Sequence, residues 1–207
     1  MQAAILLQAV KGENEEFSRR VQTSAEHIQR SVARMNTLIG DLLDLAKLEA
    51  GRFTLQCRVH EMRELIAESL VILRPLAEQK RIELSSELRG AAVRADRDRI
   101  FQVLSNLVGN AIKFTPVGGR IDLRCQQMNG EAQVTVADTG PGIAAEQLSN
   151  IFDRYWQARP DDLQGSGLGL FIAKGIVEAH GGRLWFQTEI GTGTTFFLAL
   201  PLCRTAT

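Results

Sequence analysis

The stretch NLVGNAIKF, residues 106–114, combines the apolar face of a predicted helix with three polar side chains on its other side. Asn106 and Asn110 are four residues apart, and Lys113 follows one step further along that side. Neutral amide oxygens suit a hard divalent cation that already carries phosphates, and a lysine supplies a charge for those phosphates. Taken alone, the same pattern is also typical of a polar helix face that meets water.

A second motif, ADTGPGI at residues 137–143, ends an alternating apolar run that predicts a strand. The Asp138 carboxylate can accept a hydrogen bond from an exocyclic amine. Gly140 and Gly142 let the backbone approach a flat ring, and Ile143, the last residue of the motif, is a further candidate contact. In GTGTTF at 191–196, Thr194 can place a hydroxyl beside Asp138 if the two strands are neighbours. Each motif alone is weak, because Asp and Gly are the commonest turn residues.

A third motif, GSGLGL, opens a predicted helix and frees several backbone N–H groups for a phosphate. Its candidate site residues are Gly165, Ser166, Gly167, Leu168, Gly169 and Leu170. No strand leads directly into the motif and no Lys-Ser/Thr pair follows it. These two features argue against a dinucleotide-binding fingerprint and against a P-loop.

The hydrophobic pattern divides the chain into two parts. Apolar residues at three-and-four spacing predict one long amphipathic helix over residues 15–49, with residues 2–10 as the end of an earlier helix and 11–14 as the turn between them. Such a hairpin buries little by itself and is expected to need a partner. A second unit begins at residues 51–57. Its expected strands are 52–59, 82–88, 92–95, 120–128, 133–138, 183–188 and 194–200, and its expected helices are 62–79, 97–114 and 168–180.

Composition excludes several classes of protein. The 207 residues, 44% apolar and 23% charged, are typical of a globular protein with one core and an appendage. Lys plus Arg equal Asp plus Glu at 24 each, so no basic field favours nucleic acid or an anionic membrane. The apolar stretch at residues 3–7 is too short to cross a bilayer, which predicts a cytoplasmic chain without direct membrane contact. Cys57, Cys125 and Cys203 are far apart and are expected to be reduced thiols.

Jointly and in this order, the motifs resemble the N, G1 and G2 boxes and the terminal G-x-G-T strand of the histidine kinase, gyrase and chaperone ATPase superfamily. IFDRYWQ at 151–157 resembles the F box of histidine kinases, and EAHGG at 178–182 resembles the segment after their G2 helix. MNTLIGDLLDLAKLEAGRF at 35–53 is similar to the second hairpin helix of the same family. The resemblance, to sensor histidine kinases of two-component systems, covers nearly the whole chain.

The resemblance implies an α+β fold, a two-layer α/β sandwich of the Bergerat type preceded by a helical hairpin. Residues 1–50 would be the C-terminal part of a dimerisation hairpin, and residues 51–207 an ATP-binding catalytic domain. The expected cofactors are ATP or ADP and Mg²⁺, and the expected partners are a second copy of the chain and a response regulator receiver domain.

Carried over by motif, Asp138 would bind the adenine amino group and Asn110 the magnesium ion. Asn106 and Lys113 would contact the phosphates or the ion, and residues 165–170 would wrap the phosphate tail. Residues 143–166 would form a lid that includes Tyr155. The gyrase branch carries Glu where this chain has Asn106, and a neutral amide cannot act as a base for water, so phosphoryl transfer is favoured over hydrolysis.

No catalytic residue is assigned within the chain. The family's acceptor motif, His-Asp/Glu-x-x-Arg/Asn, lies on the first hairpin helix, which here begins too late to include it. His27 is expected to be an exposed helix residue, and His60 and His180 fall at segment ends. The fragment is therefore expected to bind nucleotide without phosphorylating itself. Two alternatives stay open: a regulatory module that binds nucleotide without transfer, and a serine kinase of the anti-sigma type, which would not need the helix at 35–49.

Overall fold

The structure, a computed structural model, describes residues 15–157 and 166–203. The chain divides into two compact units, Met1–Ala46 and Lys47–Thr207. Helix α2 (Glu15–Glu49) confirms the predicted long helix. The predicted earlier helix at 2–10 and the turn at 11–14 lie outside the described residues. None of the helices that the structure describes combines the length and the apolar character that crossing a bilayer requires.

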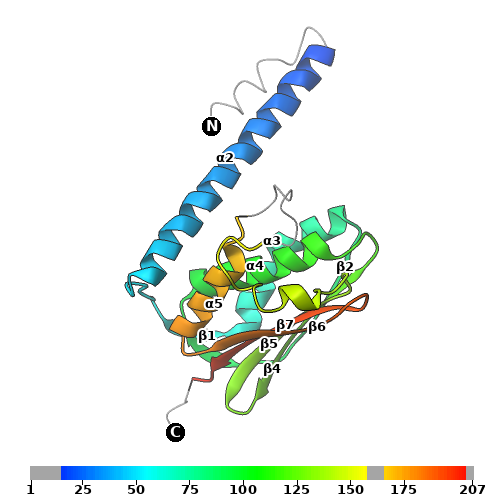
Figure 1. The fold of residues 1–207 in the computed structure, drawn as a ribbon. Coiled ribbons are helices and arrows are strands. Elements are labelled where there is room, and N and C mark those ends of the chain that lie inside the picture. Colours follow the sequence, from blue (N-terminus) through cyan, green and yellow to red (C-terminus); the bar gives the residue numbers. More distant parts are fainter. Residues whose placement is uncertain (1–14, 158–165, 204–207) are drawn as a thin grey trace. The chain divides into compact units, whose positions relative to one another are not determined.

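The second unit is a mixed sheet covered by helices on one face, as Figure 1 shows. The sheet has the strand order β2-β4-β5-β7-β6, in which β2 is parallel to β4 and the other neighbours are antiparallel. Its strands are β2 (Glu83–Leu88), β4 (Arg120–Met128), β5 (Glu131–Asp138), β6 (Arg183–Glu189) and β7 (Gly193–Pro201). The covering helices are α3 (Met62–Gln79), α4 (Arg97–Phe114) and α5 (Gly169–Ala179). This arrangement confirms the predicted α+β fold with two layers.

A second, smaller sheet pairs β1 (Arg58–Glu61) with β3 (Ala92–Ala95) in antiparallel fashion. The core lies between the large sheet and the helices, because every second strand residue points toward them. Its sheet side includes Ile121, Leu123, Cys125, Val134, Val136, Leu198 and Leu200, and its α4 side Ile100, Leu104, Leu107 and Val108, all of them buried.

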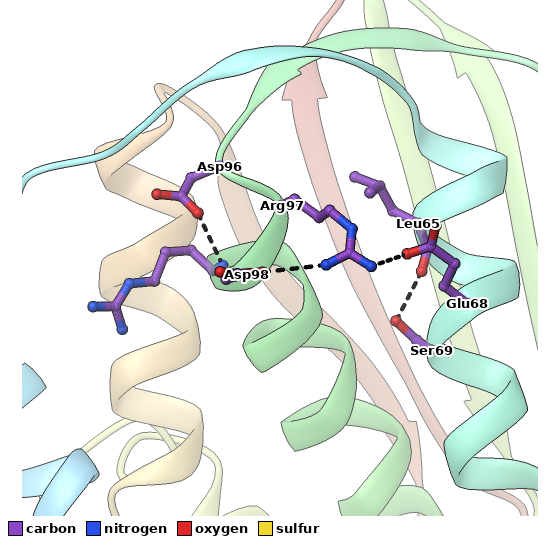
Figure 2. A network of polar contacts seen from close by, with 7 residues as sticks. Leu65, Glu68, Ser69, Asp96, Arg97 and Asp98 are labelled. Carbon is purple, nitrogen blue, oxygen red and sulfur yellow. Dashed lines mark hydrogen bonds and ion pairs between the residues drawn. The ribbon is translucent and has the colours of Figure 1, made fainter.

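Polar contacts fix the start of α4, the helix that carries the NLVGNAIKF motif. The Asp96 carboxylate accepts a hydrogen bond from the backbone N–H of Arg99 and caps the helix. Figure 2 shows Arg97 reaching from this first turn to Glu68 on α3, at 2.6 Å. His180, just after α5, accepts the Asp96 N–H at Nε2 (3.0 Å) and must therefore donate from Nδ1 to the Ile176 carbonyl (2.8 Å). The start of α4 is thus tied to α3 and to the end of α5.

Two predicted strands differ from the structure by two residues or more at one end or both, and the others by at most one residue. The strand expected at 52–59 is wrong for most of its length, because β3 offers only four residues to pair and the ladder covers Arg58–Glu61. The strand expected from residue 133 begins at Glu131, since Asn129 and Gly130 both have positive φ and form a two-residue hairpin turn. A short 3₁₀ helix, η1 (Ala145–Gln147), was not predicted.

Candidate functional site

Asp138 ends β5 at the point where the sheet meets the helices. In the antiparallel register of β5 and β7 its partner is Thr194, so the proximity expected of these two residues is confirmed. The Asp138 carboxylate accepts a hydrogen bond from the Gly140 N–H at 2.8 Å, which folds the turn back onto it. Gly193 has φ +138°, and a Cβ there would overlap the Asp138 carbonyl oxygen, so only glycine lets the strands come this close.

Thr188 links the same strand ends and was missed by the sequence reasoning. Its hydroxyl donates to the Gly193 carbonyl (3.1 Å) and accepts the Ile143 N–H (2.9 Å). The Thr188 and Thr194 hydroxyl oxygens are 2.9 Å apart, and because the Thr188 proton is already used, Thr194 is the donor there. The only sequence signal for Thr188 was its place at the end of a predicted strand.

The electrostatics of Asp138 differ from those of a surface carboxylate. Burial raises the pKa of its carboxyl group above the ordinary value, and hydrogen bonds from the backbone N–H groups of Gly140 and Thr194 offset part of that effect. A carboxylate that is short of water gains more than an exposed one from an external hydrogen-bond donor. The site is therefore suited to a neutral donor such as an exocyclic amine.

The polar face of α4 forms the second half of the site. Asn106, Asn110 and Lys113 are all half-buried on this helix. The Asn106 side chain lies 3.0 Å from the Gly169 carbonyl, and because a carbonyl only accepts, the amide nitrogen must face it. The NLVGNAIKF helix is thereby bonded to the first residue of α5, which lies within the glycine-rich motif.

One backbone contact joins the two halves. The Phe114 carbonyl at the end of α4 lies against Gly140, where a Cβ would be only 3.3 Å from that oxygen. The last turn of α4, which carries Lys113, therefore packs on the turn that follows Asp138. Residues that are far apart in the sequence meet at one end of the helical layer.

The glycine-rich motif is described from Ser166 onward, and Gly165 lies outside the described residues. Gly167 has φ +70° and packs against the backbone of Tyr155, where a Cβ would overlap the main chain. Ser166 accepts a hydrogen bond from the Leu168 N–H at 3.2 Å. Leu168 is buried, whereas Gly169 and Leu170 are half-buried. Tyr155 itself has φ +60° and is largely exposed.

The described part of the predicted lid is anchored by aromatic side chains. Ile151 is buried, and Phe152 meets Phe186 of β6 edge to face at 5.9 Å between ring centroids. The Arg154 guanidinium stacks over Phe171 of α5 at 5.1 Å and pairs with Glu49. Residues 151–154 are therefore attached to β6 and to α5, the helix that the glycine-rich motif opens.

Residues 15–157 and 166–203 hold no group of three or more His, Cys, Asp or Glu placed to bind an ion. A cavity of about 650 Å³ lies elsewhere in the second unit, beside the end of α5. Leu55, Gln56, Cys57, Arg58, Arg94, Ala179, His180, Pro201 and Leu202 line it, and none of them was predicted to be a site residue.

Comparison with known proteins agrees with the motifs. Residues 95–204 match the family described as histidine kinase-, DNA gyrase B- and HSP90-like ATPases. Histidine protein kinase DivJ of Caulobacter vibrioides is 36% identical over 182 residues, 86% of this chain and 30% of DivJ. Sensor protein SrrB of Staphylococcus aureus is 34% identical over 203 residues, 93% of this chain and 35% of SrrB. The chain thus spans about a third of the length of these relatives.

Solved structures give the same result. Full-length ShkA in complex with AMPPNP matches with a TM-score of 0.77 and 29% identity, over 98% of this chain and 42% of ShkA. The nucleotide-free catalytic domain of histidine kinase ThkA matches at 0.65 and 33%, over 71% of this chain and 96% of that domain. ThkA in complex with response regulator protein TrrA matches at 0.68 and 25%, over 99% of this chain and 57% of ThkA. The chain therefore belongs to the histidine kinase-, DNA gyrase B- and HSP90-like ATPase family, as the catalytic domain of a sensor histidine kinase with a preceding helical region.

Proposed function

We propose that this domain binds ATP with Mg²⁺ and transfers the γ-phosphoryl group to a histidine of the dimerisation hairpin, for onward transfer to a response regulator. The observation that carries the proposal is Asp138, a carboxylate of raised pKa at a strand end, held between Gly140 and Thr194. Its free lone pairs are matched to the adenine amino group. The AMPPNP complex of ShkA supports an adenine nucleotide as the ligand.

The remaining site residues would hold the triphosphate. Lys113 supplies a point charge for the phosphates, and the N–H groups that open α5 after Gly167 favour an anion at a helix start. Neutral Asn110 fits Mg²⁺, because this ion usually takes few protein ligands and shares the phosphate oxygens. When bound, the ion would neutralise charge that develops on the transferred group. Tyr155 and the segment from Gly142 to Ile143 would border the ring.

Transfer, rather than hydrolysis, follows from Asn106. Its amide donates to the Gly169 carbonyl and has no basic atom that could take a proton from water. In the proposed reaction the bond between the γ-phosphorus and the bridging oxygen breaks, a bond from an imidazole nitrogen to that phosphorus forms, and ADP leaves. Positioning and charge neutralisation therefore supply most of the catalysis.

We propose that the phosphoryl acceptor is a histidine of the hairpin that is not among the histidines of these 207 residues. Both ring nitrogens of His180 are hydrogen-bonded, and His27 lies exposed on α2 without a following acid. The chain alone is then expected to bind ATP without labelling itself. The complex of ThkA with TrrA supports a response regulator as the partner of the whole kinase. The long helix α2 favours this function over an anti-sigma-type serine kinase.

Replacement of the adenine-reading carboxylate tests the proposal. Asp138→Asn should weaken ADP binding by about tenfold to a hundredfold, because the amide turns a donor toward the adenine amino group or leaves it unpaired. Calorimetry with ADP and Mg²⁺ measures the affinity. Asp98→Asn, which alters an exposed carboxylate in the first turn of α4, is the matched control and should bind ADP as the wild type does. Equal ADP affinity in Asp138→Asn and the wild type would refute adenine recognition by this residue.

A further inference from the structure

The carbonyl groups at the end of α4 have a partner that no nucleotide motif contains. Lys80, the C-cap residue that follows α3, donates from Nζ to the Ile112 carbonyl at 2.8 Å and to the Lys113 carbonyl at 2.6 Å. Both carbonyls belong to the last turn of α4. Lys80 is half-buried, so its contact with these oxygens is shielded from water.

The helix cannot satisfy these two carbonyls itself. The partner of Ile112 four residues on is Pro116, which has no N–H, and the partner of Lys113 is Val117, beyond the end of the helix. The preceding carbonyl, of Ala111, is satisfied by the Thr115 N–H at 2.9 Å. The Lys80 ammonium group therefore supplies the missing donors and interacts favourably with the negative end of the helix dipole.

Backbone contacts fix the neighbouring turn but leave this last turn of α4 to the lysine. The Gly118 N–H donates to the Arg81 carbonyl, and the Glu83 N–H donates to the Gly119 carbonyl. These bonds hold the connection between α4 and β4 whatever residue stands at position 80. Loss of the Lys80 side chain would thus loosen one turn of α4 rather than the whole junction.

The geometry points to Lys80 as a positioning residue for nucleotide binding, which acts through the last turn of α4 on the phosphate contact of Lys113. This inference rests on the proposed function. The same turn carries the Lys113 side chain and the Phe114 carbonyl that packs on Gly140. α3 itself contributes no residue to the candidate site, so the influence of Lys80 on ligand affinity must pass through α4.

The test compares three variants of the full chain in binding to ADP with Mg²⁺ and to adenosine. Lys80→Met keeps the methylene stem and removes the donors, and it should weaken ADP binding by about tenfold while adenosine binding changes less than about twofold. Lys80→Arg keeps the charge and should recover most of the ADP affinity. Arg89→Met, which removes an exposed cation paired with Glu87, is the matched control and should bind both ligands normally.

A residue that only stabilised the fold would lower the unfolding temperature without this difference between ADP and adenosine. In a Lys113→Met background, Lys80→Met should weaken ADP binding by less than about twofold further, because the contact through which it acts is already gone. Lys80→Gln replaces Lys80→Met throughout if the latter does not fold.

Three outcomes would overturn the inference. The first is an unchanged ADP affinity in Lys80→Met, and the second is an equal loss of ADP and adenosine binding in that variant. The third is a further tenfold loss of ADP binding when Lys80→Met is added to Lys113→Met. Each would contradict the inference and leave the proposed function standing. Failure of the wild type to bind ADP would refute the proposed function itself, and this inference with it.

Discussion

At the scale of single residues, Asp138 combines a cost to the empty fold with a gain for the ligand. Its raised pKa means that the folded chain holds the Asp138 proton more tightly than the unfolded chain. The contribution of this group to stability is therefore largest at low pH and is lost as the pH rises through the folded pKa. The charged form that suits an adenine amino group is the form that the empty fold tolerates least.

This opposition predicts the pH dependence of binding. As the pH falls from 7 to about 5, Asp138 should become protonated at a higher pH than an ordinary Asp, because its pKa is raised. The decline in ADP affinity should therefore also begin at a higher pH. Titration calorimetry of the wild type and Asp138→Asn across this range separates the effect from titration of the phosphates, which both proteins share. Parallel pH profiles would mean that Asp138 is not the group responsible.

Asn106 illustrates how one amide sets both geometry and chemistry. Asn106→Asp would place a carboxylate oxygen against the Gly169 carbonyl, where an N–H now donates at 3.0 Å. We expect a loss of about 1–3 kcal/mol in the free energy of unfolding and weaker ADP binding. Urea unfolding and calorimetry with ADP and Mg²⁺ measure these effects. Asn36→Asp on the exposed face of α2 is the control, and an Asn106→Asp variant with the stability and the ADP affinity of the wild type would contradict the account.

At the scale of elements, α2 carries an apolar stripe that the described structure leaves exposed. Ile28, Val32, Met35, Ile39 and Leu42 follow a spacing of four, three, four and three residues, and each is at least 45% exposed. This is the spacing of a helix seam in bundles and coiled coils. A second copy of the chain is the occupant that we propose, in keeping with a dimerisation hairpin.

A charge in the stripe tests this assignment. Ile39→Glu should shift the chain from dimer toward monomer, because a seam position cannot bury a lone carboxylate without a cost of several kcal/mol. Thr37→Glu adds the same charge two residues away, on the opposite side of the helix from the stripe, and should leave the dimer intact. Sedimentation velocity over a range of concentrations measures the equilibrium. A wild type that is monomeric at every concentration would rule out dimerisation through α2.

The helices and most strands were predictable because their signals are local. The three-and-four spacing in α3 and α4 and the alternation in β4 are written in consecutive residues. The strand expected at 52–59 failed because its length depends on β3, which is distant in the sequence. At residues 129–130 the chain does carry a hairpin signal, Asn-Gly, and attention to it would have moved the start of β5 to Glu131.

At the scale of the whole molecule, the site was only partly predictable, because it depends on contacts between residues that are distant in the sequence. The motifs named Asp138 and Thr194, but their proximity was conditional until β5 and β7 were seen to pair. Thr188 and Lys80 carried no motif, since their roles arise from contacts across 45 residues in one case and 32 in the other. Asn106 was predicted as a phosphate or ion contact, and its bond to Gly169 adds a second task that spacing could not reveal.

In the proposed kinase, nucleotide binding and the attacking nucleophile are assigned to different parts of the whole molecule. The catalytic domain would supply the nucleotide, the ion and the geometry, and a separate hairpin histidine would supply the nucleophile. Binding and transfer can then be separated by experiment. Nucleotide binding would need this chain alone, whereas transfer would need an intact hairpin that carries the acceptor.

The most direct measurement is labelling with γ-³²P ATP, with and without a separate polypeptide that carries the complete hairpin. The account predicts no label on the chain alone and label on the hairpin when both are mixed, lost in acid and kept in alkali, as a phosphoimidazole requires. Asp138→Asn in place of the wild type should reduce that label by at least about tenfold at limiting ATP. Label on the chain itself that survives acid would contradict the account and identify a serine or threonine kinase instead.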